Sequence, residues 1–386
     1  MNDTSISALS ATQRRDWLRL IRSENVGTVT FFRLLERFGS ARAALDALPD
    51  LARQGGRRSY KIYPESKVDD ELAHLDRIGA RLIAWCEPDY PEALRAVEGG
   101  PPLFSALGNT HLLARPSVAI VGARNASANG LSFARKLSAE LGRGGFGCNN
   151  LVVTSGLARG LDAAAHHGAL ETGTIAVLGG GVDVVYPKEN DRLYDEVVER
   201  GLVIAEMAVG TKPAARLFPI RNRLISGLSR GVVVVEASPR SGSLITARLA
   251  LEQGREVFAV PGAPGDPRTR GTNGLIREGA TLTESAADVL RVLGEAGTLS
   301  SGPQFNFDFG ALNASKDNPD ELDLARSQIK ELLGNSPVAV DELVRNCQFS
   351  IAAVSAVLLE LELAGRLERQ PGNRVCLIID HDEMSV

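Results

Sequence analysis

The sequence predicts a doubly wound, mostly parallel α/β sheet with a helical segment before it and a winged helix after it. Between residues 117 and 293, short β-branched runs alternate with amphipathic stretches, as in strands joined by crossover helices. Apolar residues recur at helical spacing before this region. Three helical patterns, a basic turn and a strand follow it. At 386 residues, the chain is long enough for two or three domains with cores of their own.

The N-terminal segment has a helix, hairpin, helix pattern. Trp17 and Leu20 mark one apolar helical face and Phe31 and Leu34 a second, and the break at 25–28 contains residues that tolerate positive φ. We expect a helical domain over residues 1–85, similar to SAM or helix-hairpin-helix modules. Such a hairpin can direct backbone N–H groups at a phosphate, and a small helical packing domain fits the pattern equally well.

Six apolar runs define the predicted sheet of the central domain, which we place at residues 86–296. The predicted strands are 117–121, 151–154, 174–178, 202–205, 232–237 and 256–260. The predicted helices between and after them are 127–141, 161–170, 191–199, 222–228 and 243–253. Several runs are continuously apolar, as a strand covered on both faces should be. The chain therefore contains a Rossmann-like sheet with helices on both faces.

The C-terminal part begins after a stretch without periodicity, rich in Gly, Ser, Asn and Asp, which predicts a linker at 297–320. Residues 321–386 then show three helices, a basic turn at 366–374 and a strand, the arrangement of a winged helix. This domain holds six basic and eleven acidic residues. Its expected recognition helix, 350–364, has no basic residue but has Glu360 and Glu362. Because phosphate contacts dominate DNA affinity, we expect this domain to contact protein, with the wing arginines as a weaker route to DNA.

Composition excludes several classes of protein. No run approaches the length of a membrane-spanning helix, and the first residues lack the features of a secretory signal. The four cysteines lie far apart without a CxxC motif, which argues against disulfides and zinc and favours the cytoplasm. The formal net charge of −4 is an average over unequal regions, so it does not decide whether nucleic acid is a partner.

Glycine-rich loops follow three of the predicted strands, and in a parallel sheet these loops meet at one edge. Gly122 and Arg124 follow the first strand, Ser155 and Gly156 the second, and three glycines at 179–181 the third. Glycine lets backbone N–H groups approach a phosphate, and Arg124 adds charge. Each glycine could instead serve only a tight turn between strand and helix.

The segment 212–255 carries eight basic and two acidic residues, a net charge of +6. An aromatic ring within a basic groove suits single-stranded nucleic acid, in which each stacked base contributes about 1–3 kcal/mol. The alternative is a solvated charged face with Phe218 in the core. The candidate contacts in this segment are Lys212, Arg216, Phe218, Arg221, Asn222, Arg223, Ser241, Gly242 and Ser243.

No catalytic or metal-binding constellation emerges from the spacing of the ionisable residues. Asp162 and His166 lie four residues apart on one predicted helix, an arrangement that is more often structural than catalytic. Asp183 and Glu236 end strands without an evident partner. We therefore expect no enzyme activity, no metal and no cofactor.

The central segment resembles the DNA-processing protein A family (DprA, also called Smf) across most of the chain. The stretches that carry the resemblance are 120–124, 155–162 with His166, 176–179 through Asp183, Tyr186-Pro187 with Asn190, 218–229, 235–237, 241–246 and 260–262. The N-terminal helical module and the winged helix fit a three-part version of this family.

The resemblance implies a non-enzymatic protein of the bacterial cytoplasm that binds single-stranded DNA. It implies protection of incoming strands during natural transformation, loading of the RecA recombinase, and a homodimer built through the Rossmann-like domain. It assigns phosphate contacts to Gly122 and Arg124, with 221–223 nearby, base stacking to Phe218, and a basic rim to Lys212 and Arg216. Two departures are Ala123, where the family often has a hydroxyl, and Asn25, where hairpin modules usually have glycine.

Two other functions remain open at this point. A nucleotide-processing hydrolase of Rossmann-like fold would have a glycine loop after a late strand, and 239–243 occupies that place without a clear catalytic glutamate. A regulatory adaptor would act through the acidic winged helix.

Overall fold

The computed structural model describes residues 8–147, 150–296 and 319–378, with 335, 348 and 371 excepted. These residues form two compact units, one made of 9–69 with 319–378 and the other of 70–296. The expected linker at 297–320 lies outside the described residues, apart from its last two positions. Within the described residues, no helix is both long enough and apolar enough to cross a membrane.

The central unit is built on a nine-stranded sheet, in the order β1-β2-β6-β5-β4-β3-β7-β8-β9. The strands are β1 (Arg81–Ala84), β2 (Leu103–Gly108), β3 (Ser117–Val121), β4 (Val152–Ser155), β5 (Thr174–Leu178), β6 (Leu202–Ala205), β7 (Gly231–Val234), β8 (Glu256–Ala259) and β9 (Thr281–Leu282). All neighbours from β6 to β9 pair in parallel, whereas β1 and β2 are antiparallel additions. The predicted doubly wound sheet is confirmed, with residues 81–84 forming its edge.

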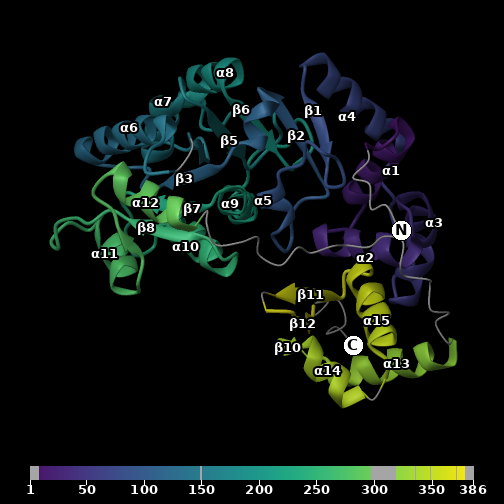
Figure 1. Cartoon of the computed structure of the whole chain (residues 1–386). Coiled ribbons are helices and arrows are strands. Elements are labelled where there is room, and N and C mark those ends of the chain that lie inside the picture. The colour runs from purple at the N-terminus through teal and green to yellow at the C-terminus, as the bar shows by residue number, and fades with distance from the viewer. Residues whose placement is uncertain are drawn as a thin grey trace. The chain divides into compact units, whose positions relative to one another are not determined.

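Helices cover both faces of this sheet (Figure 1). One face carries α6 (Ala128–Arg143), α7 (Leu161–Ala169), α8 (Asp191–Arg200) and α12 (Ala286–Ala296), and the other α5 (Glu92–Arg95), α9 (Leu217–Leu228) and α10 (Gly242–Glu252). Short helices η1 (Thr110–Ala114), η2 (Lys188–Asn190) and α11 (Arg270–Arg277) complete the unit. The main core lies between β3, β4 and β7 and helices α6, α7 and α12, where Ile120, Val153 and Phe258 are buried. Burial of continuous apolar strands on both faces therefore fixes the fold.

Helix α9 begins earlier than the sequence pattern predicts, at Leu217 instead of residue 222. Pro219 lies in the first turn, where a missing N–H costs no intrahelical hydrogen bond. The helical pattern was therefore hidden by a residue that is compatible with a helix start. As a consequence, Phe218 is held on the first turn of a helix and not on a loop.

The other unit combines the N-terminal helices with the winged helix. Its helices are α1 (Ala11–Arg22), α2 (Thr28–Phe38), α3 (Ala41–Gln54), α13 (Pro319–Leu332), α14 (Val340–Cys347) and α15 (Ile351–Leu363), and α4 (Glu65–Arg77) begins in this unit. Its strands β10 (Val338–Ala339), β11 (Leu367–Gln370) and β12 (Arg374–Leu377) form a sheet in the order β10-β12-β11. Serine caps start the helices: Ser10 forms a capping box with Gln13, and Ser350 accepts from the N–H of Ala353. The predicted helical module and winged helix are both confirmed.

Candidate nucleic-acid interface

The candidate residues lie on loops and helix starts that follow strands β3 to β7. The first turn of α9 brings Phe218 to Tyr186, and the ring centroids are 5.8 Å apart at an angle of 37°. A Cβ added to Gly179 would lie 3.2 Å from the Phe218 ring, so this glycine makes room for the ring. The Phe218 side chain is half-buried, and Tyr186 is 46% exposed. The two rings form an aromatic surface that sequence reasoning identified only in part, because it omitted Tyr186.

A guanidinium lies over this surface. The Cζ atom of Arg124 is 5.3 Å from the centroid of Phe218, within the range of a cation–π interaction. Arg124 comes from the loop after β3, and Phe218 comes from α9, so the fold brings together two residues that are distant in sequence. Their proximity gives one surface both a π face and a positive charge.

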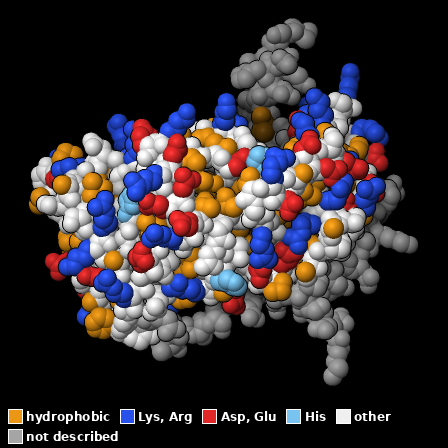
Figure 2. Space-filling model, turned by 90° about the horizontal axis from the view of Figure 1, so that it is seen from above, with side chains coloured by type: hydrophobic (Ala, Val, Ile, Leu, Met, Phe, Trp, Pro, Cys, Tyr) orange, Lys and Arg blue, Asp and Glu red, His pale blue; other side chains and the backbone are white. Residues whose placement is uncertain are grey.

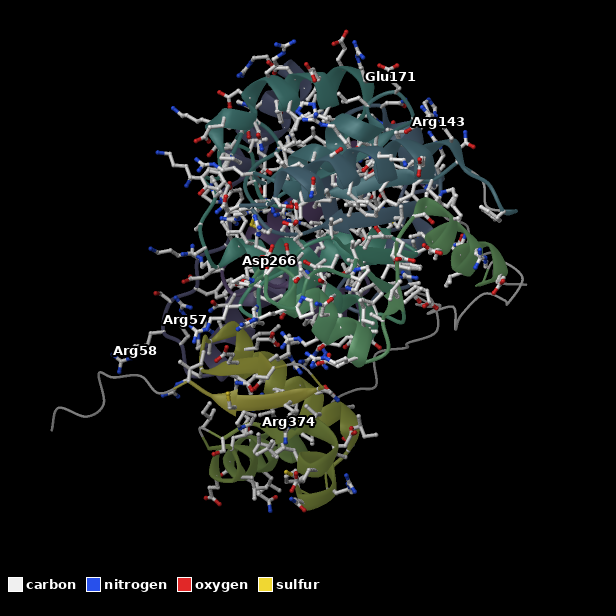
Figure 3. The ribbon with its side chains drawn as sticks, turned by 90° about the vertical axis from the view of Figure 1, so that its left-hand side faces the viewer. Arg57, Arg58, Arg143, Glu171, Asp266 and Arg374 are labelled. Atoms are coloured by element: carbon white, nitrogen blue, oxygen red, sulfur yellow. The ribbon has the colours of Figure 1, made fainter. Side chains whose placement is uncertain are left out.

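Three exposed cations in this region lack acidic partners. Within the described part of the chain, no ion pair involves Arg124, Lys212 or Arg216, and all three are exposed. Two other arginines of the unit form ion pairs. Arg159 pairs with Glu189, and Arg268 pairs with Asp266, whose position on the loop after β8 is shown in Figure 3. Each of these three cations is therefore available to a phosphate without the loss of an ion pair.

Arg221 has a different environment from its exposed neighbours. It is only 6% exposed, and its Nη1 donates to the carbonyl oxygen of Gly156 at 2.7 Å and to that of Val177. Burial lowers the pKa of the Arg221 guanidinium to about 10, and the nearby Asp162 carboxylate opposes this shift. A Cβ at Gly156 would lie 2.4 Å from Nη1 of Arg221. Arg221 thus holds the loop after β4, and a direct contact between its guanidinium and DNA stays a prediction.

Arg223 and Asn222 are engaged within the protein. Arg223 donates from Nη2 to both carboxylate oxygens of Glu206, at 2.6 and 2.5 Å, and from Nη1 to the carbonyl of Gly99. The Asn222 side-chain oxygen accepts from Nε of Arg221 at 3.3 Å. The basic segment therefore separates into an exposed set around Phe218 and a structural set beneath it. Sequence could not make this distinction, because it shows charge but not burial.

Two buried ionisable groups shape the loop after β4. The Asp162 carboxylate accepts from the N–H of Gly156 at 3.1 Å, and His166 Nε2 accepts from that of Leu157 at 3.3 Å. Burial raises the pKa of the Asp162 carboxyl and lowers that of the His166 imidazole to about 3. Leu157 adopts a positive φ of 55°, and Asn190 donates to its carbonyl at 2.9 Å. These contacts hold the loop rigidly at the sheet edge, as a structural role for the Asp–His pair predicts.

The helix start after Gly122 is closed by the protein itself. A Cβ at Gly122 would lie 2.2 Å from the Leu161 side chain, so the glycine permits close packing. Ser127 caps α6, and the Glu236 carboxylate accepts from both its N–H, at 2.9 Å, and its hydroxyl. The N-terminus of α6, which was expected to face a phosphate, faces a carboxylate in this structure. A contact between Gly122 and DNA stays a prediction.

The remaining serine and glycine candidates occupy mixed environments. The Ser155 hydroxyl is buried and donates to the carbonyl of Ile120 at 2.6 Å. Ser241 caps α10, and its hydroxyl lies 2.7 Å from that of the buried Ser243. Gly242 is exposed, and a Cβ there would meet nothing within 4 Å. A contact between DNA and any of these four residues stays a prediction.

The helical face over α6, α7 and α8 carries charges of both signs. Figure 2 shows Lys and Arg interspersed with Asp and Glu on this side, with no extended area of one sign. Ion pairs join Lys136 to Glu140 and Arg200 to Glu171. A polyanion gains little on such a surface, because carboxylates lie among the cations.

Comparison with known families identifies all three parts of the chain. The model described as "DNA recombination-mediator protein A" matches residues 81–294. The "DprA-like N-terminal HHH domain" matches 11–73, and the "DprA winged helix domain" matches 313–373.

Individual relatives agree with these matches. Protein Smf of Escherichia coli is 38% identical over 82% of this chain and 83% of its own, and Protein Smf of Synechocystis is 32% identical over 95% and 99%. The X-ray structure of DNA processing protein A from Streptococcus pneumoniae superposes with a TM-score of 0.60 and 36% identity, covering 74% of this chain and 98% of that one. A structure of the Helicobacter pylori protein, whose title describes its single-stranded DNA binding mode, gives 0.51 and 28%, covering 56% and 96%.

Proposed function

The chain belongs to the DprA/Smf family of DNA recombination mediators, and from this premise we propose that it binds single-stranded DNA around Phe218. The observation that carries the proposal is the aromatic surface of Phe218 and Tyr186 beneath the exposed Arg124. Bases of a single strand have free π faces, whereas those of a duplex are stacked on each other. A half-buried ring can therefore accept a base from a single strand with about 1–3 kcal/mol of stacking energy.

The exposed cations supply the contacts to the backbone. Arg124, Lys212 and Arg216 lack acidic partners among the described residues, so each can neutralise a phosphate without first breaking an ion pair. Single-strand binding then weakens with salt, and each phosphate contributes about −0.7 to the slope of log K against log salt. Arg221, Asn222, Ser155 and Gly156 support this surface from beneath. Arg223 belongs to the same structural set, and we assign Gly122 and the start of α10 at 241–243 to the margin of the surface.

We assign the chain the biological role that its family suggests, namely protection of incoming single strands and loading of RecA during natural transformation in the cytoplasm. A homodimer through the central unit would place two such surfaces on one assembly. Two surfaces on one strand raise the overall affinity through effective concentration. The direct test is displacement of a single-strand-binding protein from DNA in the presence of RecA, measured as RecA-dependent ATP hydrolysis. No stimulation by the full chain would refute the loading role.

The hydrolase alternative requires a carboxylate that is free to act on a nucleotide. Glu236 ends β7 at the edge where such chemistry would occur, but its carboxylate already accepts two hydrogen bonds from Ser127. A phosphate at the start of α6 would also meet this negative charge. Incubation with nucleoside monophosphates tests the point. We expect no release of base or phosphate, and turnover lost in Glu236→Gln would favour the hydrolase.

A further inference from the structure

The recognition helix of the winged helix is buried on more than its core side. In winged-helix and related proteins, this helix enters the major groove and must have one face open. In α15, Leu359 and Leu363 are 2% and 0% exposed, yet neither belongs to the apolar core of the winged helix. Helix α15 packs against α3 of the N-terminal helices, which accounts for their burial. The face that would meet DNA is thus an apolar protein contact.

The hairpin of the N-terminal module is occupied by the same helix. Asn25, at the tip between α1 and α2, has a φ of 57° and donates from Nδ2 to the carbonyl of Leu363 at 3.0 Å. That carbonyl belongs to the negative end of α15. The hairpin of a DNA-binding module would direct its donors at a phosphate, and here a side-chain donor of the tip has a helix carbonyl as its acceptor.

At the end of α3, the backbones of α3 and α15 lie very close together. A Cβ at Gly55 would lie 2.1 Å from the carbonyl oxygen of Glu360 and 2.8 Å from the Cβ of Ala364. Gly55 has φ −67° and ψ −6°, a conformation open to every L-residue. The glycine is therefore required by the neighbouring helix and not by its own backbone. Arg57, labelled in Figure 3, lies at the same contact, 3.8 Å from the position of a Cβ on Gly365.

Acidic groups of α15 are neutralised within the winged helix, so they do not oppose docking. Glu360 is 1% exposed and accepts from Nε and Nη2 of Arg326 on α13, at 2.7 and 2.9 Å. Glu362 accepts from Nε of Arg369 on β11 at 3.0 Å. The two glutamates that make α15 unsuited to phosphate contacts are therefore paired with arginines inside the winged helix.

From these contacts, we propose that the N-terminal hairpin and α15 of the same chain form an interface that withholds both elements from DNA. The partner of the winged helix is then the N-terminal helical module, to which it presents an apolar stripe and a helix C-terminus. Neither of these two elements is then available to DNA. This proposal does not rest on the proposed function, because the two involve different units.

Gly55→Ala in the full chain tests the proposal by hydrogen exchange. The added methyl collides with α15 and leaves α3 unstrained, so segments 23–27 and 359–365 are expected to exchange at least about fivefold faster together. Gly274→Ala in α11 is the control, because a Cβ at Gly274 meets nothing within 4 Å and the residue lies outside both segments. Unchanged exchange at 359–365 in Gly55→Ala would overturn the interface.

A milder variant covers the case in which Gly55→Ala fails to fold. Asn25→Gly removes the side-chain hydrogen bond without a collision and tolerates the positive φ, and we expect roughly a twofold to tenfold increase in exchange at 363–365, the effect of one lost hydrogen bond. Exchange equal to that of the wild type would contradict the proposal. Dilution by about a hundredfold should leave wild-type protection unchanged, because intrachain docking does not depend on concentration. Loss of protection on dilution would instead assign the contact to a second copy.

DNA supplies the final arm of the same experiment. Neither a single-stranded nor a duplex oligonucleotide should alter exchange at 23–27 or 359–365 in the wild type. Added protection of either segment by DNA would show that these elements bind it, and the proposal would fail. The central unit can still bind single strands in that case, so the result separates this proposal from the proposed function.

Discussion

The arginines beside Phe218 and those that pair with the acidic residues of the helical unit have opposite surroundings. Around Phe218 in the central unit, Arg124 and Arg216 are exposed and have no acidic partner among the described residues. In the other unit, Arg326, Arg369 and Arg57 pair with Glu360, Glu362 and Glu24. The comparison teaches that the availability of charge, and not its amount, distinguishes a surface for nucleic acid from a protein interior.

The largest effect should come from the buried arginine beneath the site. Arg221→Ala leaves the Asp162 carboxylate buried without its countercharge and frees the carbonyls of Gly156 and Val177. We expect a loss of about 3–5 kcal/mol in the free energy of unfolding, measured by chemical denaturation. Arg216→Ala, exposed at the start of the same helix, should change stability by less than about 0.5 kcal/mol. Equal stability of the two variants would contradict the structural role of Arg221.

The ion pair of the winged helix should give the next largest effect. Arg326→Ala leaves Glu360 buried and unpaired. We expect the free energy of unfolding of the winged helix to fall by about 3 kcal/mol, measured from the unfolding transition of this domain. Arg326 pairs with Glu360 and lies outside the central unit, so single-strand affinity should stay unchanged. A tenfold loss of affinity, about 1.4 kcal/mol, would show that the two units cooperate in binding.

Replacing the ring while keeping its bulk isolates stacking from packing. Phe218→Leu retains an apolar side chain above Gly179 but removes the π face, so single-strand affinity should fall by about 1–3 kcal/mol. Tyr186→Leu, on the more exposed ring, should cost less. Fluorescence anisotropy with a labelled oligonucleotide measures both. If Phe218→Leu bound as tightly as the wild type, stacking would have to occur elsewhere.

Acid should destabilise the loop after β4 through protonation of His166. The native pKa of this imidazole is about 3, and that of the unfolded chain is near 6.5. Its contribution to stability is therefore complete above pH 6.5 and is lost as pH falls, by at most about 1.4 kcal/mol per pH unit. Burial raises the pKa of the Asp162 carboxyl, so this group lowers the stability of the folded state as pH rises above its unfolded pKa. His166→Gln should flatten the acid limb of a stability–pH curve, and an unchanged slope would assign that limb to other groups.

Sequence patterns predicted the parallel sheet well because β6 is continuously apolar, β3 and β5 are apolar after their first residue, and each is followed by a helical stretch. They missed β1, β2 and β9, which pair at the margins of the sheet. The start of α9 was placed too late because Pro219 disguised its first turn. Composition indicates a strand only when burial on both faces imposes a strong pattern.

The candidate site was predicted in its residues but not in their roles. Motifs identified Arg124, Phe218 and Arg221 together, and the fold brings them together. Both guanidinium groups lie near the Phe218 ring, but Arg221 is buried and donates to two carbonyl oxygens, whereas Arg124 is exposed. Tyr186 was missed as a site residue because only the fold places its ring beside that of Phe218. Such distinctions require long-range contacts that a single sequence does not contain.

The central claim, that exposed charge beside Phe218 binds single strands, is tested most directly by one titration. Wild type, Arg124→Ala and Arg374→Ala are compared by anisotropy with a single-stranded oligonucleotide at two salt concentrations. Arg374 is an exposed arginine on β12 of the winged helix and provides the matched control. Arg124→Ala should bind roughly tenfold more weakly and lower the salt slope by about 0.7, whereas Arg374→Ala should match the wild type within about twofold. Equal losses in both variants, or none in Arg124→Ala, would contradict the account.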